Sequence, residues 1–205
     1  MLFNILVIVC VLLGVVLMKL FLQLFPYLAD SFLRVRGGAV LENNLRLSRD
    51  RNVLALAMLL PAVLLMYRYR LYDPVFLQGL PSNLYMLSLL GVLVAYLLIR
   101  FLLYQLLKPR RRFDFYRLAH RAGYTYFILL MSLLLATVGI LALIPCNDLT
   151  IKRFIYTEVL VFYLFFLLRR AQILSRSCNP LRTFLYLCGL EFLPTSLLVL
   201  SAIRL

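Results

Sequence analysis

The chain has 205 residues, of which 64% are hydrophobic, and it carries a formal net charge of +14. Soluble domains are nearer half apolar, so this composition excludes an ordinary soluble fold and predicts an integral membrane protein. The positive charge does not indicate nucleic-acid binding, because the basic residues lie beside hydrophobic segments and no recognition motif accompanies them.

Apolar stretches alternate with short polar connections along the whole chain, which is the pattern of a polytopic helix bundle. We therefore predict an all-α membrane protein with six transmembrane helices that form one integral membrane domain over residues 1–205. The predicted helices are approximately residues 2–25, 53–67, 84–107, 124–144, 151–168 and 183–200.

The first predicted helix has Lys19 near its far end, where the side chain can reach the lipid headgroups. A polar connection over residues 31–52 follows and contains five arginines and the pair Gly37-Gly38. Leucine and valine side chains among these charges fit a short amphipathic helix on the membrane surface, and a solvated linker fits equally well. Pro61 then interrupts the second helix, because it lacks a backbone N–H and frees the carbonyl of Ala57.

The third helix ends in the densest basic run of the chain. We expect this run to contact anionic headgroups at the cytoplasmic face. Residues 113–121 mix aromatic and basic side chains, and we interpret them as a segment lying among those headgroups. The residues of the basic run are Lys108, Arg110, Arg111 and Arg112.

The fourth helix carries small residues at three-residue steps, namely Ala136, Gly139 and Ala142. Such a face lets another helix approach closely, so we predict that it is a helix-packing face. The fifth helix contains Glu158, which lies less deeply in the membrane than the acid of the sixth helix. Basic residues at the same end of the bundle are candidate partners for this acid: Arg68, Arg70, Lys152 or Arg153.

The sixth helix holds Glu191 near its middle, and a carboxyl group at that depth is a candidate for a functional or structural role. Pro194 frees the Leu190 carbonyl, for which Thr195, Ser196 or a protonated Glu191 could be the donor. Helical spacing places Cys188 and Thr195 on the same face as Glu191, and we predict that this narrow polar face contacts protein.

Residues Leu185–Pro194 read LYLCGLEFLP. This motif resembles a C-terminal signature, Leu-Cys-x-Leu-Glu-x-Leu-Pro, of an uncharacterised family of polytopic inner-membrane proteins from Bacteroidota. Gly139 to Pro145 is similar to that family's penultimate hairpin. The resemblance implies a bacterial inner-membrane location and a domain of unknown function, and it places Glu191 and Pro194 within the family motif.

The distribution of basic residues predicts the orientation of the helices. Sixteen of the 22 lysines and arginines fall in the odd-numbered connections and four in the even-numbered ones. Because cytoplasmic connections are enriched in Lys and Arg, we expect the odd connections in the cytoplasm and both termini outside it. The four cysteines fit small apolar fillers, and none has metal-ligand spacing.

Three classes of function remain open from the sequence. We favour a non-enzymatic subunit or scaffold of a larger membrane complex, because the connections are short and the helices carry association features. The alternative is a small proton- or solute-coupled transporter that uses Glu191 and Glu158 as titrating groups. A lipid-modifying enzyme is the third, although we find no catalytic motif and predict no cofactor. Protein partners in the membrane are expected, and their identity is open.

Overall fold

The computed structural model describes residues 2–33, 41, 43–107, 113–144, 147–175 and 180–204. Every regular element in these residues is helical, which confirms the predicted all-α class. The elements are α1 (Leu2–Leu33), α3 (Leu45–Ala57), α4 (Leu59–Arg68), the 3-10 helix η1 (Val75–Leu77), α5 (Ser82–Leu107), α6 (Phe113–Leu143), α7 (Asp148–Ser175), α8 (Pro180–Leu187), the π-helix η2 (Cys188–Phe192) and α9 (Leu193–Arg204).

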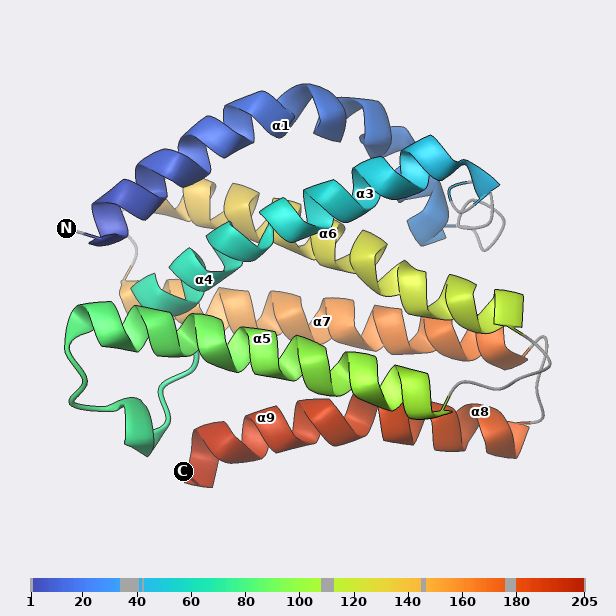
Figure 1. Ribbon diagram of the computed structural model, residues 1–205. Coiled ribbons are helices and arrows are strands. Elements are labelled where there is room, and N and C mark those ends of the chain that lie inside the picture. The colour runs from blue at the N-terminus through green and yellow to red at the C-terminus, as the bar shows by residue number, and fades with distance from the viewer. Residues whose placement is uncertain are drawn as a thin grey trace.

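The helices form an up-and-down bundle in which both termini lie at the same end (Figure 1). α6 and α7 pack against each other, α1 and α3 pack on α6, and α5 contacts both α4 and the η2–α9 segment. Leu24, Leu54 and Ile128 are fully buried where α1, α3 and α6 meet. Ile155 of α7 is buried in a second cluster that also includes Met131 of α6.

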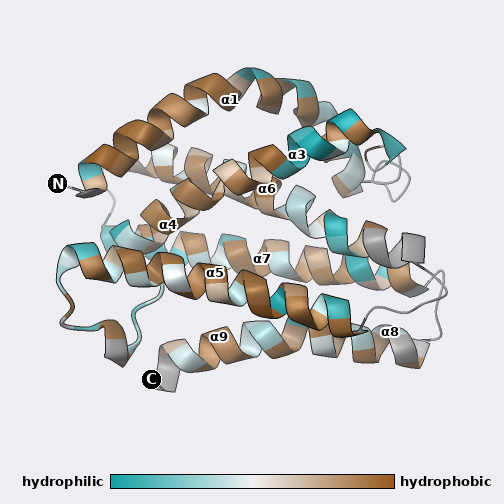
Figure 2. Ribbon diagram, in the orientation of Figure 1, coloured by the Kyte–Doolittle hydropathy of each residue, from teal (hydrophilic) through white to brown (hydrophobic). Residues whose placement is uncertain are grey.

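Five segments among the described residues are long and apolar enough to cross a membrane: Phe3–Phe32, Leu45–Arg68, Ser82–Leu106, Leu118–Leu143 and Thr183–Ala202. The most apolar window of the first segment buries none of its residues within the chain. Figure 2 shows hydrophobic residues along most of α1 and α5 and hydrophilic residues in the first half of α3. An apolar surface of this extent needs a lipid or protein covering, so these features indicate a multi-pass membrane protein.

α7 is not among the five segments, because charged residues at both ends interrupt its apolar stretch. Lys152, Arg153 and Glu158 lie toward one end, and Arg169 and Arg170 lie toward the other. α7 nevertheless runs alongside α6 in the middle of the bundle (Figure 1). The sixth crossing therefore stays a prediction.

The helices are longer than the hydrophobic pattern predicted. α1 continues through Pro26 to Leu33 and curves (Figure 1), as expected for a helix with an internal proline. α3 begins at Leu45, because the Asn44 side chain caps its first turn by accepting hydrogen bonds from the backbone N–H of Arg46 (3.1 Å) and of Leu47 (3.4 Å). Most described residues of the predicted polar connection are thus helical.

Residues 113–121 are the first turns of α6, which therefore begins 11 residues before the predicted start at Tyr124, and their place among lipid headgroups stays a prediction. No proline or glycine interrupts the chain between Phe113 and Ala122, so the helix continues into its apolar part. The His120 ring lies against the ring of Tyr104 of α5, with 4.0 Å between their centroids. The predicted interruption near Pro61 is confirmed, since α3 ends at Ala57 and α4 begins at Leu59.

Candidate functional site

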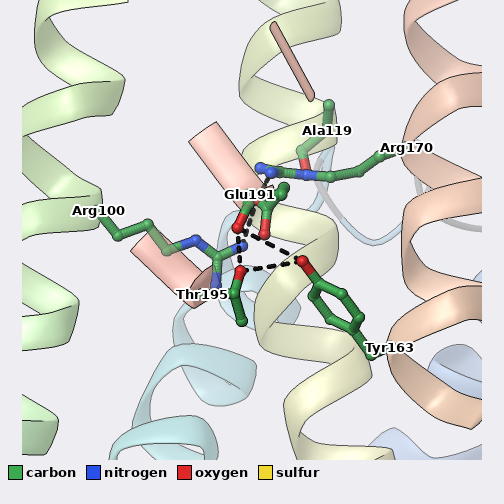
Figure 3. A network of polar contacts seen from close by, with 6 residues as sticks. All are labelled: Arg100, Ala119, Tyr163, Arg170, Glu191 and Thr195. Atoms are coloured by element: carbon green, nitrogen blue, oxygen red, sulfur yellow. Dashed lines mark hydrogen bonds and ion pairs between the residues drawn. The ribbon is translucent and has the colours of Figure 1, made fainter. Parts of the chain in front are cut away.

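Glu191 lies in η2 with only 1% of its surface exposed, so it faces other helices as predicted. Two arginines meet its carboxylate (Figure 3). Arg100 of α5 donates from Nη2 to Glu191 Oε1 over 2.7 Å, and Nη1 of Arg170 of α7 forms an ion pair with the same oxygen. The candidate site is therefore a buried ionic cluster of one acid and two bases.

The cluster joins four helical segments. Arg170 is 4% exposed, and its Nε donates to the backbone carbonyl of Ala119 in α6 over 2.8 Å. Arg100 comes from α5 and Glu191 from η2, so the polar contacts connect α5, α6, α7 and the C-terminal segment. Polar contacts of this kind fix helix positions in an apolar bundle, where packing alone is less directional.

Phe166 of α7 supports both guanidinium groups. The Arg100 and Arg170 guanidinium carbons lie 5.5 and 5.1 Å from the centre of its ring, within the range of cation–π contacts. Gly123 of α6 lies beside this arrangement, and a Cβ there would sit 3.4 Å from Arg100 Nη2 and 3.8 Å from Phe166 Cζ. A Cβ at Gly123 would be in van der Waals contact with both side chains, so a larger side chain there would have to displace them.

The charges do not cancel, since two guanidiniums surround one carboxylate. Both guanidinium groups lie within ion-pair distance of the same carboxylate oxygen of Glu191. The second carboxylate oxygen, Oε2, is buried without a hydrogen-bond partner. A protonated Glu191 is one of three donors that the sequence offers for the Leu190 carbonyl, and in the structure its carboxylate is the acceptor of two arginines.

The backbone around Glu191 is held by a second set of contacts. The Thr195 hydroxyl donates to the Glu191 carbonyl, and Tyr163 of α7 donates to the same carbonyl over 3.4 Å. Tyr163 and Thr195 also share a hydrogen bond of 2.9 Å (Figure 3). Thr195 therefore satisfies the Glu191 carbonyl and not the Leu190 carbonyl that Pro194 was predicted to free.

The π-helical turn over Cys188–Phe192 ends two residues before Pro194, and the Leu193 N–H donates to the Cys188 carbonyl across it. π-helical turns are rare and occur often at functional sites. The wider turn changes the helical register on which the predicted face rested. Within that face Glu191 and Thr195 are confirmed as protein-facing, and Cys188 is half-buried.

Glu158 is not paired with the basic residues that the sequence proposed. It accepts a hydrogen bond from Thr137 of α6 over 3.0 Å. Of the proposed partners, Arg68 pairs with Asp148, Arg70 pairs with Asp73, and Lys152 donates to the Arg70 carbonyl. The prediction was wrong because spacing along the sequence gives depth in the membrane but not the direction in which a helix face points.

The small residues Ala136, Gly139 and Ala142 lie on the outside of the bundle. A Cβ added at Gly139 would meet no atom within 4 Å. The face is therefore not used for packing within the chain, among the residues that the structure describes.

The basic run Lys108, Arg110, Arg111 and Arg112 lies outside the described residues, as do Cys146 and Cys178. Within the described ranges, no group of three His, Cys, Asp or Glu side chains could hold a metal ion.

The two arginines of the cluster are not evident from the sequence pattern. By position, Arg100 and Arg170 resemble flanking charges that set orientation. One signal is present in the sequence: Arg100 stands in an apolar stretch with at least seven uncharged residues on either side, and an intramembrane charge needs a partner.

Comparison with known proteins found no matching family model, no matching curated protein and no matching solved structure. The class of protein therefore follows from the chain itself, and that class is a multi-pass helical membrane protein. The resemblance of Leu185–Pro194 to the Bacteroidota family stays a prediction.

Proposed function

We propose that the protein is a non-enzymatic subunit or scaffold of a larger complex in a bacterial inner membrane, with six crossings and both termini outside the cytoplasm. The observation that carries the proposal is the outward position of Ala136, Gly139 and Ala142 on α6. Small residues at helical spacing let a second helix approach closely, and no helix of the same chain occupies this position among the described residues. A transmembrane helix of a partner protein fits it.

The six-crossing arrangement is supported by the polar partners of the charged residues in α7. Arg170 pairs with Glu191, and Glu158 accepts a hydrogen bond from Thr137. Groups that are satisfied in this way can be placed in a membrane at lower cost than isolated charges. The common end of the two termini agrees with an even number of crossings (Figure 1).

The ionic cluster supports a structural role for Glu191. Its carboxylate is held by Arg100 and Arg170, and its backbone carbonyl is held by Thr195 and Tyr163. The cavity beside Arg170 is about 10 Å³, which is at the lower limit for holding one water molecule. A residue fixed at this many points positions the C-terminal helix and presents a defined surface to a partner.

The α6 face gives a direct experiment. Gly139→Leu should leave the isolated protein folded, because a Cβ added there meets no atom of the chain within 4 Å, but should displace a partner helix. Gly14→Leu is the matched control, since Gly14 of α1 is also exposed and a Cβ added there also meets no atom within 4 Å. Purification of tagged variants in mild detergent should yield a partner with wild type and Gly14→Leu and lose it with Gly139→Leu. Equal recovery with all three proteins contradicts the proposal.

A second candidate function is proton- or solute-coupled transport. The observation that favours it is the buried, unpartnered Oε2 of Glu191 in a π-helical turn, which is the kind of irregular intramembrane site that transport proteins use. Purified protein in liposomes should then carry a proton or solute flux that Glu191→Gln abolishes. A scaffold shows no such flux in either form.

A further inference from the structure

A second polar feature lies at the end of the bundle where both termini lie, away from the Glu191 cluster. The connection between α4 and α5 borders an open cavity of about 580 Å³ there. Its polar lining residues are Tyr67, Arg68, Arg70, Asp73, Gln78, Ser82 and Tyr85. The cavity thus brings two cations, one acid, three hydroxyl groups and one amide to one place.

The cavity also has apolar lining residues. Phe3 of α1, Leu77 of η1 and Leu80 line it. Because the cavity sits where membrane-length helices end, it lies at the depth of lipid headgroups when the bundle spans a membrane. A ligand that fits it has a charged group joined to an apolar part.

The connection that forms the cavity is held in place by contacts to three helices. Tyr72 is buried, its hydroxyl is 2.7 Å from the hydroxyl of Ser201 in α9, and its carbonyl accepts a hydrogen bond of 2.9 Å from Tyr85 of α5. Lys152 of α7 donates to the Arg70 carbonyl over 2.9 Å. The cavity is therefore a preformed feature of the fold.

Two backbone conformations shape its rim. Gly79 has φ +94°, which favours glycine. Arg70 has φ +44°, in the left-handed region that a residue with a side chain rarely adopts. Such a conformation is strained and is found often at ligand sites. Here it points to a function for the Arg70 side chain at the cavity.

The ion pairs at the rim are weak and can exchange partners. Arg68 lies 3.6 Å from Asp148, and Arg70 lies 3.9 Å from Asp73. Both guanidiniums are more than half exposed, at 57% and 74%, so solvent screens these pairs. A phosphate offers each guanidinium a shorter, two-point contact, because its oxygens match the guanidinium fork.

We propose that this cavity binds the headgroup of a phospholipid that carries both a phosphate and a primary ammonium, as phosphatidylethanolamine does. Arg68 and Arg70 bind the phosphate, and Tyr67 or Ser82 donates a further hydrogen bond to it. Asp73, released from Arg70, accepts the ammonium group. Phe3, Leu77 and Leu80 contact the glycerol and the first part of the acyl chains. The partner protein proposed above takes no part in this site.

Native mass spectrometry of the purified, delipidated protein tests this assignment. Phosphatidylethanolamine is added at increasing concentration, with phosphatidylglycerol as the headgroup that lacks an ammonium and soluble phosphoethanolamine as the headgroup without acyl chains. We expect wild type to prefer phosphatidylethanolamine. Arg68→Gln and Arg70→Gln should each weaken its binding about tenfold, because each removes one charge-assisted contact.

Asp73→Asn tests the ammonium contact separately from the phosphate contact. It should lower the affinity for phosphatidylethanolamine to that for phosphatidylglycerol. The affinity for phosphatidylglycerol should not fall, because only the ammonium contact is lost. Arg153→Gln is the matched control, since Arg153 is an exposed arginine of α7 and does not line the cavity. Should Arg68→Gln reduce the yield of folded protein, Arg68→Lys keeps the charge, loses the two-point contact and should still bind more weakly than wild type.

The proposal is overturned if wild type forms no lipid adduct or binds the two lipids equally. It is also overturned if Arg68→Gln and Arg70→Gln both bind phosphatidylethanolamine as tightly as Arg153→Gln does. Binding of soluble phosphoethanolamine as tight as that of the lipid supports the headgroup chemistry and identifies a free ligand as the source. Binding of phosphatidylethanolamine without binding of soluble phosphoethanolamine identifies the membrane as the source.

Discussion

Replacing Glu191 by leucine is the sharpest perturbation of the ionic cluster. The substitution leaves Arg170, which is 4% exposed, and Arg100 as neighbouring cations without their shared anion. Breaking a buried ion pair by removing one partner costs about 3–5 kcal/mol. For a protein of this size each kcal/mol lowers Tm by about 2–4 °C, so Glu191→Leu should lower Tm by about 6–20 °C.

The same reasoning predicts recovery when all three charges are removed together. Replacing a buried ionic group by apolar residues of similar size is often neutral. A variant with leucine at positions 100, 170 and 191 should therefore have a free energy of unfolding within about 2 kcal/mol of the wild-type value. Because the chain has no tryptophan, unfolding in detergent is followed by far-ultraviolet circular dichroism.

Glu158→Gln serves as the control for this experiment, since Glu158 accepts one hydrogen bond from Thr137. This substitution should lower the free energy of unfolding by only about 1 kcal/mol. A Glu191→Leu variant as stable as wild type refutes the structural role of the cluster. So does a triple variant that is no more stable than Glu191→Leu alone.

Four further substitutions or labels test other parts of the structure. Tyr163→Phe should destabilise the protein by about 1 kcal/mol in the same melting assay, because Thr195 still donates to the Glu191 carbonyl when the tyrosine hydroxyl is gone. Asn44→Ala should cost about 1 kcal/mol through loss of the α3 cap, measured against Asn43→Ala as a neighbouring exposed position. Gly123→Leu should lower Tm where Gly139→Leu does not, because only the former meets Arg100 and Phe166. Labelling of intact cells with an impermeant thiol reagent should modify Cys146 and spare Cys178, and the reverse pattern would overturn the proposed orientation.

The apolar segments of the sequence predicted the helical class and the approximate position of each long helix, because a membrane requires long runs of hydrophobic residues. The ends of the helices were less predictable. Asn44 begins α3 well before the apolar run, and α1 passes through Pro26, so local capping and packing extended both helices beyond their hydrophobic parts.

The candidate site was predictable only in part. Glu191 stood out because it is an acid within a long apolar helix, and its burial followed from the cost of exposing a charge to lipid. Its partners lie 91 and 21 residues away along the chain, on α5 and α7, and hydropathy does not encode which helix faces meet. The π-helical turn was also hidden, although Pro194 indicated an irregularity close to it.

The mass of the native particle tests the central claim most directly. Wild-type protein extracted in mild detergent and examined by native mass spectrometry should form a particle that contains a second polypeptide in a fixed ratio to this 23.8-kDa chain. A particle that contains only the 23.8-kDa chain, in every mild detergent that keeps it folded, would contradict a subunit or scaffold function.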